Sequence, residues 1–215
     1  MTAPVRLSVT MLDTYVSGMA DESMSAEALA RRLFLPLDHV PLAMQAGTAL
    51  HTCLEHAGDG DDLQLLMTEA TNGFVFLLPD HLDGLLELGT VREHKQVLNL
   101  GSVHLVGKFD ALTATHVIDH KLAGKFDAER YMDSLQWRAY LMMTGRPQFA
   151  YQVFEHCGIP EDLDENGNHV ITIRDYHRME LAPYAGMRDD VLDVVHDLAS
   201  FARDWLPIVR PDKIQ

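Results

Sequence analysis

The chain has 215 residues, and 17 lysines and arginines against 32 aspartates and glutamates give it a formal net charge of −15. Hydrophobic residues make up 47% of the chain and charged residues 23%, which excludes an intrinsically disordered protein and, at this length, predicts one domain. The two cysteines, Cys53 and Cys157, are too few for a disulfide framework, a four-cysteine zinc site or a four-cysteine iron–sulfur cluster within one chain.

The charge distribution sets further expectations. No apolar run approaches the roughly 20 residues of a membrane span, and the segment after Met1 lacks a signal peptide's hydrophobic region, so we expect a cytoplasmic protein with no membrane partner. The acidic balance disfavours non-specific nucleic-acid binding. However, the acidic clusters at 59–62, 161–165 and 189–197 lie outside the segment from Arg92 to Arg146, where basic residues outnumber acidic ones. A small local DNA-binding surface is therefore compatible with the charge.

The N-terminal part predicts helices. A helix begins within Leu7–Tyr15, capped by Ser8 or Thr10 and with Leu12 and Tyr15 facing inward. Another covers Ala26–Phe34 and is closed by Pro36. A third covers 40–57, with Pro41 in its first turn, and places Gly47, His51 and Glu55 on one face. A turn at 58–62 and helices over 63–69 and 79–88 complete this part.

The character of the sequence changes after Gly89. Alternating and β-branched residues predict strands at 90–98, 102–112 and 116–122. A helix capped by Asp127 is expected through Met143, followed by strands at 148–155 and 169–176 and a helix over 183–206 that ends before Pro207. These elements predict an α/β fold around one mixed central sheet. Within the one domain, we expect a helical part over 1–89, a core over 90–155, and a C-terminal strand and helix over 156–215.

Three charged residues carry the candidate chemistry. Asp119 and Lys121 stand two apart on one strand, so their side chains share a face about 6.5 Å apart along it. If the preceding strand pairs with this one as a hairpin, Asp110 lies beside Asp119. Two adjacent carboxylates repel each other, and a divalent cation relieves that repulsion. Oxygen ligands of this kind suit Mg²⁺ or Mn²⁺.

The order of short motifs adds a resemblance. Asp110 followed by Asp119-x-Lys121 resembles the signature of the PD-(D/E)xK nuclease superfamily. Within it, the chain is similar to the RecB-like nuclease group over about residues 7–145, because four further motifs of that group occur in order: Ser8-x-Thr10-x-Leu12-x-x-Tyr15, Gly47-x-x-x-His51, Gly107-x-x-Asp110 and Gln136-x-x-x-Tyr140. Each motif alone is weak, but five in the right order are a strong signal.

The resemblance implies a restriction-endonuclease-like fold and phosphodiester hydrolysis assisted by Mg²⁺ or Mn²⁺. Asp110, Asp119, His51 and the carbonyl of His120 would be metal ligands, and Lys121 would assist the attacking water. Gln136 and Tyr140 would support Lys121 or a phosphate, and Ser8, Thr10 and Tyr15 would join them in binding the substrate.

It also implies partners. The chain lacks the four cysteines of the cluster-containing branches, and the resemblance then implies the compact, cluster-free form that is typical of phage or prophage exonucleases. DNA would then be the substrate, and a single-strand annealing or recombination protein would be a partner. An oligomer of the chain is compatible with this resemblance.

Other interpretations remain open. The fold could serve as a catalytically silent binding or assembly module in a recombination complex, or the protein could hydrolyse a small phosphorylated substrate. His51 could be a packed histidine, and Gly47 could allow a helix to approach a sheet. We interpret Glu93, on the strand before Asp110, as a cross-strand surface charge rather than a neighbour of the metals. Zinc is disfavoured by the spacing of the strand histidines, and calcium because no glutamate stands at the closing position required of a calcium loop that begins within 161–168.

Overall fold

A computed structural model describes residues 4–57, 67–79 and 86–211. Its centre is a seven-stranded sheet in the order β1-β4-β5-β6-β7-β2, with β3 paired to β4. The strands are β1 Val5–Ser8, β2 Phe74–Leu77, β3 Val91–Asn99, β4 Val103–Leu112, β5 His116–Ala123, β6 Gln148–His156 and β7 His169–Leu181. The pairs β1–β4, β5–β6 and β2–β7 are parallel and the others antiparallel. The predicted α/β fold with one mixed sheet is confirmed.

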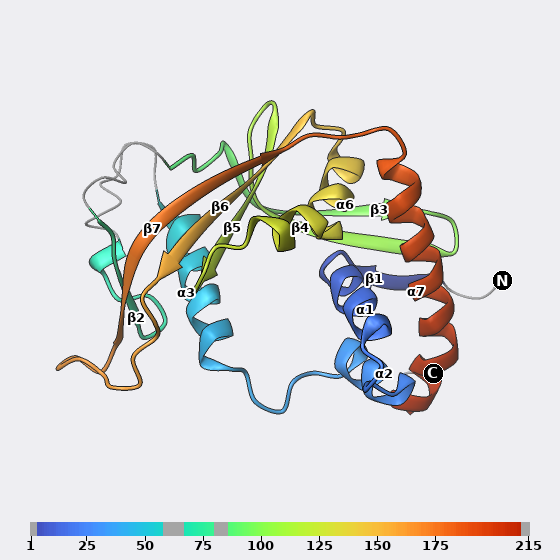
Figure 1. Cartoon of the computed structure of the whole chain (residues 1–215), viewed down its shortest axis with the longest axis horizontal. Coiled ribbons are helices and arrows are strands. Elements are labelled where there is room, and N and C mark those ends of the chain that lie inside the picture. Colours follow the sequence, from blue (N-terminus) through green and yellow to red (C-terminus); the bar gives the residue numbers. More distant parts are fainter. Residues whose placement is uncertain (1–3, 58–66, 80–85, 212–215) are drawn as a thin grey trace.

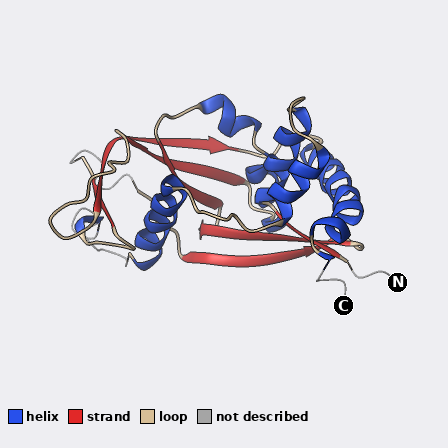
Figure 2. Cartoon of the chain, turned by 90° about the horizontal axis from the view of Figure 1, so that it is seen from below, coloured by secondary structure: helices blue, strands red, loops and turns tan. Residues whose placement is uncertain are grey.

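Helices cover both faces of the sheet. They are α1 Thr10–Ala20, α2 Ala26–Phe34, α3 Leu42–His56, α5 Ala128–Asp133, α6 Leu135–Thr144 and α7 Met187–Val209. In Figure 1, α1, α2 and α7 gather at one end of the molecule and α3 stands apart toward the other, and Figure 2 shows the same separation from below. Alternate residues of β6 therefore enter two different cores: Tyr151 and Val153 pack in the core that includes the first group, and Phe154 packs in the core beside α3.

Most predicted elements are confirmed to within a few residues, and several are not. The strands β1 and β2 were not expected; each has only four residues. The first helix follows β1 with Val9 at its N-cap and no side-chain cap, so the expected capping by Ser8 or Thr10 is wrong. The turn at 58–62, and most of the helices expected over 63–69 and 79–88, lie outside the described residues. No helix in the part of the chain that the structure describes is long and apolar enough to cross a membrane.

The helix expected from Asp127 to Met143 is two helices. Ser134 separates α5 from α6 with an extended backbone (φ −58°, ψ 137°), and its hydroxyl accepts from the Gln136 amide at 3.1 Å. Asp13, on α1, accepts from the Leu135 amide and the Ser134 hydroxyl, each at 2.6 Å. These bonds satisfy the donors at the start of α6, so a distant carboxylate stabilises the break.

The C-terminal helix passes through Pro207 and ends at Val209, whereas the sequence predicted an end before the proline. A proline removes one backbone donor and so one hydrogen bond of the helix. Pro207 lies in the last turn, where only two further helical residues follow it. The long apolar face of α7, which includes Val191, Val195 and Leu198, holds the helix against the core.

Candidate active site

Asp110 on β4 comes close to β5 at the point where the pairing of these two strands ends. The two strands pair only at Ala111–Ile118 and Leu112–Val117. Beyond these pairs β5 stays paired with β6, and the Asp110 side chain bridges the space between β4 and β5: its Oδ2 accepts from the His120 amide at 2.7 Å. The hairpin expected from the sequence therefore does place Asp110 next to the strand segment that carries Asp119.

Asp119 and Lys121 form an ion pair in which the carboxylate is buried and the lysine side chain is 30% exposed. Their Oδ2 and Nζ atoms lie 2.6 Å apart, and only 2% of the Asp119 side chain is exposed. Burial raises the pKa of Asp119 to about 6, with Lys121 opposing the rise and Asp110 adding to it. Burial lowers the pKa of Lys121, but the neighbouring Asp119 and Asp110 outweigh it and raise that pKa overall. Lys121 therefore holds a positive charge at neutral pH.

Gln136 and Tyr140 support this pair from α6. The Gln136 Nε2 atom donates to Asp119 Oδ1 at 2.8 Å and to the Tyr140 hydroxyl at 3.3 Å. The Tyr140 hydroxyl in turn donates to the Lys108 carbonyl of β4 at 2.8 Å. The sequence assigned both residues to Lys121 or to a phosphate. In the structure, Gln136 binds Asp119 and Tyr140 binds the backbone of β4. Tyr140 is only 2% exposed.

His51 reaches the same place from α3. Its Nδ1 atom lies 3.1 Å from Asp110 Oδ1. Burial lowers the pKa of His51, but the hydrogen bond and the charge of Asp110 outweigh it, so that this pKa is raised overall. Burial raises the pKa of Asp110, but the hydrogen bond and the charge of His51 outweigh it, so that this pKa is lowered overall. The ring of His120 is buried near that of His51, with centroids 6.3 Å apart, and burial lowers its pKa to about 4. The neutral form of His120 is therefore favoured.

Glu93 lies closer to Asp110 than the sequence predicted. It stands on β3 between the pairs Arg92–Ala111 and His94–Phe109, and so opposite Asp110. Its backbone has φ +50°, a left-handed conformation uncommon for residues other than glycine. Glu93 forms an ion pair with Lys108, and ligand atoms of His51, Glu93 and Asp110 lie within 4.8 Å of one another. The sequence predicted Glu93 as a cross-strand surface charge; the ion pair with Lys108 agrees with the cross-strand part, but only 12% of the Glu93 side chain is exposed and it lies beside Asp110.

A signal for Glu93 was present in the sequence. The turn around Gly101 (φ +76°) joins β3 and β4, and a hairpin folded about this point sets Glu93 against Asp110. Asp119, which the sequence grouped with the metal ligands, is absent from the group of described side chains that could hold an ion; its carboxylate is directed to Lys121 and Gln136.

The N-terminal motif residues lie in other surroundings. The Ser8 and Thr10 hydroxyls are 2.9 Å apart at the junction of β1 and α1. Tyr15 is buried, with its ring 5.5 Å from that of Phe201 on α7. Its ring thus packs in the core between helices. Among the described residues, a carbon built on Gly47 would meet no atom within 4 Å, so close packing of α3 on the sheet does not explain that glycine.

A cavity of about 840 Å³ adjoins the Asp119–Lys121 pair. Lys121, Gln136 and Tyr151 line its inner part, α5 contributes Arg130 and Tyr131, and α1, α2 and α7 form the remaining walls. Cationic and anionic side chains both face it, including Arg32, Arg138, Asp190 and Asp193. A cavity of this volume can hold a short segment of a polymer beside the Lys121 ammonium.

The chain matches no protein-family model and no curated protein. Solved structures do resemble it. A putative exonuclease from Eubacterium rectale has a TM-score of 0.53 at 11% identity, over 98% of this chain and 89% of that one. LHK-Exo in complex with dAMP has a TM-score of 0.46 at 13% identity, over 92% and 88%; LHK-Exo is an alkaline exonuclease from Laribacter hongkongensis. The first of these likenesses shows a shared fold.

Proposed function

We propose that the protein is a metal-dependent deoxyribonuclease that acts as an exonuclease. The observation that carries this proposal is the meeting of two groups at the parting of β4 and β5: the Asp119–Lys121 pair, and the potential ligand group of His51, Glu93 and Asp110. The fold shared with a putative exonuclease supports it.

The donor set fits a divalent cation. Glu93 and Asp110 bring two carboxylates together beside the His51 imidazole, and a cation offsets the repulsion between them. The two carboxylates suit Mn²⁺ or Mg²⁺, so Glu93 and Asp110 would hold the ion with His51 beside them. The nearby Asp119 and the His120 carbonyl are further candidates. When bound, the ion would supply positive charge against the phosphate group.

The chain's own residues supply the remaining functions. Lys121, charged and partly exposed beside the cavity, is placed to orient a water molecule and to offset charge that develops on a phosphate oxygen. Asp119 holds the Lys121 ammonium, and Gln136 fixes Asp119. Tyr140 ties this support to β4 through the Lys108 carbonyl. Preorganised charge of this kind loses little energy to rearrangement during the reaction.

Within this proposal, Mg²⁺ is the expected ion and DNA recombination or phage DNA processing in the cytoplasm the expected setting. A single-strand annealing or recombination protein would be the partner, and an oligomer would enclose the DNA more fully. Ser8 and Thr10 remain candidates for substrate contact at the start of α1.

A catalytically silent binding module is the second candidate, since a charge of −15 opposes the approach of DNA. The ion pair of Lys121 with the buried Asp119 favours the enzyme, because it holds a charged ammonium beside the cavity with 30% of the lysine side chain exposed.

Hydrolysis of end-labelled linear DNA tests the proposal. The unaltered protein should release nucleotides in the presence of Mg²⁺ or Mn²⁺, and this release should stop when a chelator removes the ion. Lys121→Met should lower the rate by about a hundredfold or more, because it removes the positive charge and keeps an apolar stem of similar length. A folded protein that leaves linear and single-stranded DNA intact in both ions would contradict the proposal, and undiminished activity in Lys121→Met would assign the hydrolysis to a contaminant.

A further inference from the structure

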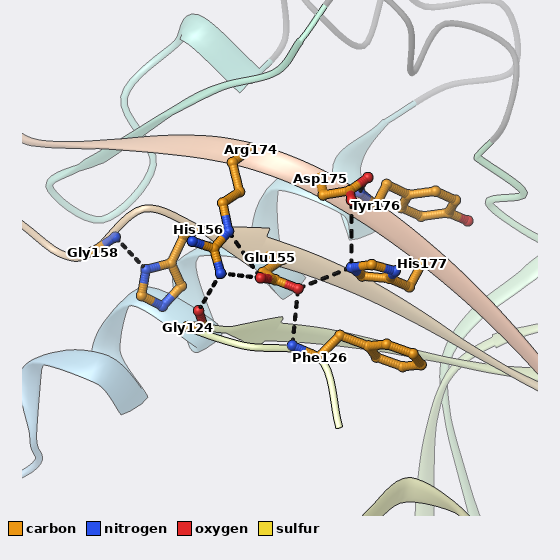
Figure 3. A network of polar contacts seen from close by, with 9 residues as sticks. All are labelled: Gly124, Phe126, Glu155, His156, Gly158, Arg174, Asp175, Tyr176 and His177. Carbon is orange, nitrogen blue, oxygen red and sulfur yellow. Dashed lines mark hydrogen bonds and ion pairs between the residues drawn. The ribbon is translucent and has the colours of Figure 1, made fainter. Parts of the chain in front are cut away.

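The chain that leaves β5 is tied to the sheet at two backbone points (Figure 3). Glu155, on β6, accepts from the Phe126 amide through Oε2 at 2.9 Å. Its Oε1 accepts from Arg174 Nε at 2.8 Å and from Arg174 Nη2, and Nη2 also donates to the Gly124 carbonyl at 3.1 Å. Both ends of the segment 124–126 are therefore fixed by one carboxylate and its arginine.

A stack of rings extends this tie to α5. His177 on β7 donates to Glu155 Oε2 at 2.9 Å and lies flat on Phe126, with centroids 4.3 Å apart and planes at 10°. The other neighbour of Phe126 is Tyr131 of α5, at 5.7 Å and 20°. Tyr131 then contacts Tyr151 at 4.8 Å, and the Lys121 ammonium lies 6.0 Å from the Tyr151 ring. Glu155 and Lys121 are thus joined through packed side chains.

Helix α5 depends on such external support. It has six residues, none of them buried, and so short a helix is not stable by itself. Besides its own Asp127 cap, it is held at its end by the Met132 carbonyl, which accepts from Trp137 and Arg138. The start of α5 is held through Phe126. Because Arg130 and Tyr131 line the cavity beside Lys121, the position of α5 sets the shape of that wall.

We propose that Glu155 is a positioning residue: it fixes the turn 124–126 and thereby holds α5 so that Arg130 and Tyr131 contact the nucleic-acid strand next to Lys121. This inference rests on the proposed nuclease function. Arg130 supplies a cation for a phosphate and Tyr131 an aromatic edge for a sugar or base. The Phe126 amide, Arg174 and His177 together lower the pKa of Glu155 to about 2, so the tie is intact at every pH at which DNA hydrolysis would be measured.

The variant Glu155→Gln tests the role, because it keeps the shape of the side chain and removes its charge. If α5 moves, the cavity wall formed by Arg130 and Tyr131 binds the nucleic-acid strand more weakly. The positions of Lys121 and of the group His51, Glu93 and Asp110 do not change. We expect KM for linear DNA to rise about tenfold with kcat within about twofold of the unaltered protein. Glu180→Gln is the matched control: Glu180 is an exposed carboxylate on β7 that pairs with Arg178 and His116. It should leave KM unchanged.

A second readout does not depend on catalysis. Amide hydrogen exchange over 124–133 should become at least about tenfold faster in Glu155→Gln and stay unchanged in Glu180→Gln. Arg174→Gln, which removes the bond to the Gly124 carbonyl, should act in the same direction and serves if the first variant fails to fold. An unchanged KM, or equal exchange in Glu155→Gln and Glu180→Gln, would overturn the inference. If the unaltered protein hydrolyses no DNA, the proposed function fails, and the role of Glu155 in it fails too. Faster amide hydrogen exchange in Glu155→Gln would then still show that Glu155 fixes the segment 124–126.

Discussion

At the scale of single residues, the site combines two carboxylates with opposite environments. Asp110 faces His51 and a backbone amide and has a lowered pKa, whereas burial raises the pKa of Asp119 to about 6. The first is suited to holding a cation and the second to holding the Lys121 ammonium. The difference arises from their strands, because Asp110 lies where β4 leaves β5 and Asp119 lies under α6.

Glu93 gives the sharpest residue-scale prediction. Glu93→Gln should raise the Kd for Mn²⁺, measured by calorimetry, by about tenfold or more, since it removes one of the two carboxylate charges. Glu55→Gln is its control: Glu55 is exposed on α3, one turn beyond His51. Equal Mn²⁺ affinity in the two variants would show that Glu93 is not a ligand of the ion.

At the scale of elements, two motif glycines have different roles. A carbon built on Gly107 of β4 would lie 3.0 Å from Met143 Sδ and 3.2 Å from Tyr140 Cε1, so this glycine lets α6 approach the sheet. Gly47, in the middle of α3, has open space around it. One glycine is required by packing, and the other is not.

Urea unfolding distinguishes the two. Gly107→Ala should lower the free energy of unfolding by about 1–3 kcal/mol through overpacking. Gly47→Ala should raise it by about 0.5–1 kcal/mol, because alanine is the better helix former. A loss of stability in Gly47→Ala would mean that α3 packs more closely than its contacts indicate.

Several elements followed from the sequence, and others could not. Hydrophobic periodicity located α2, α3 and most strands because their patterns are local. The break at Ser134 depends on Asp13, and β1 depends on parallel pairing with β4 almost a hundred residues later; neither leaves a local pattern. The spacing of Asp110, Asp119 and Lys121 was enough to predict their meeting. Glu93 was judged a surface charge although the register of the β3–β4 hairpin, which sets it opposite Asp110, could be read from the turn at Gly101.

At the scale of the whole molecule, the acidic charge is placed close to the cavity as well as far from it. Asp193 of α7 lines the cavity, whereas Asp204 of the same helix lies about 16 Å farther along its axis. A charge near the cavity opposes the entry of a phosphate, and a distant one is screened by salt.

Neutralising one of these charges tests that effect. At about 20 mM salt, Asp193→Asn should lower KM for linear DNA about twofold with kcat unchanged. Asp204→Asn should have no effect, and the difference should vanish near 0.5 M salt. A lower KM that persists at high salt would indicate a direct contact instead of long-range repulsion.

The central claim is that His51, Glu93 and Asp110 hold a divalent ion beside the Asp119–Lys121 pair. A crystal soaked in Mn²⁺, with anomalous scattering recorded for the unaltered protein and for Asp110→Asn, tests it most directly. We predict an anomalous peak among these three side chains that is lost in Asp110→Asn. A saturated soak with no peak there, or a peak that Asp110→Asn leaves in place, would contradict the claim.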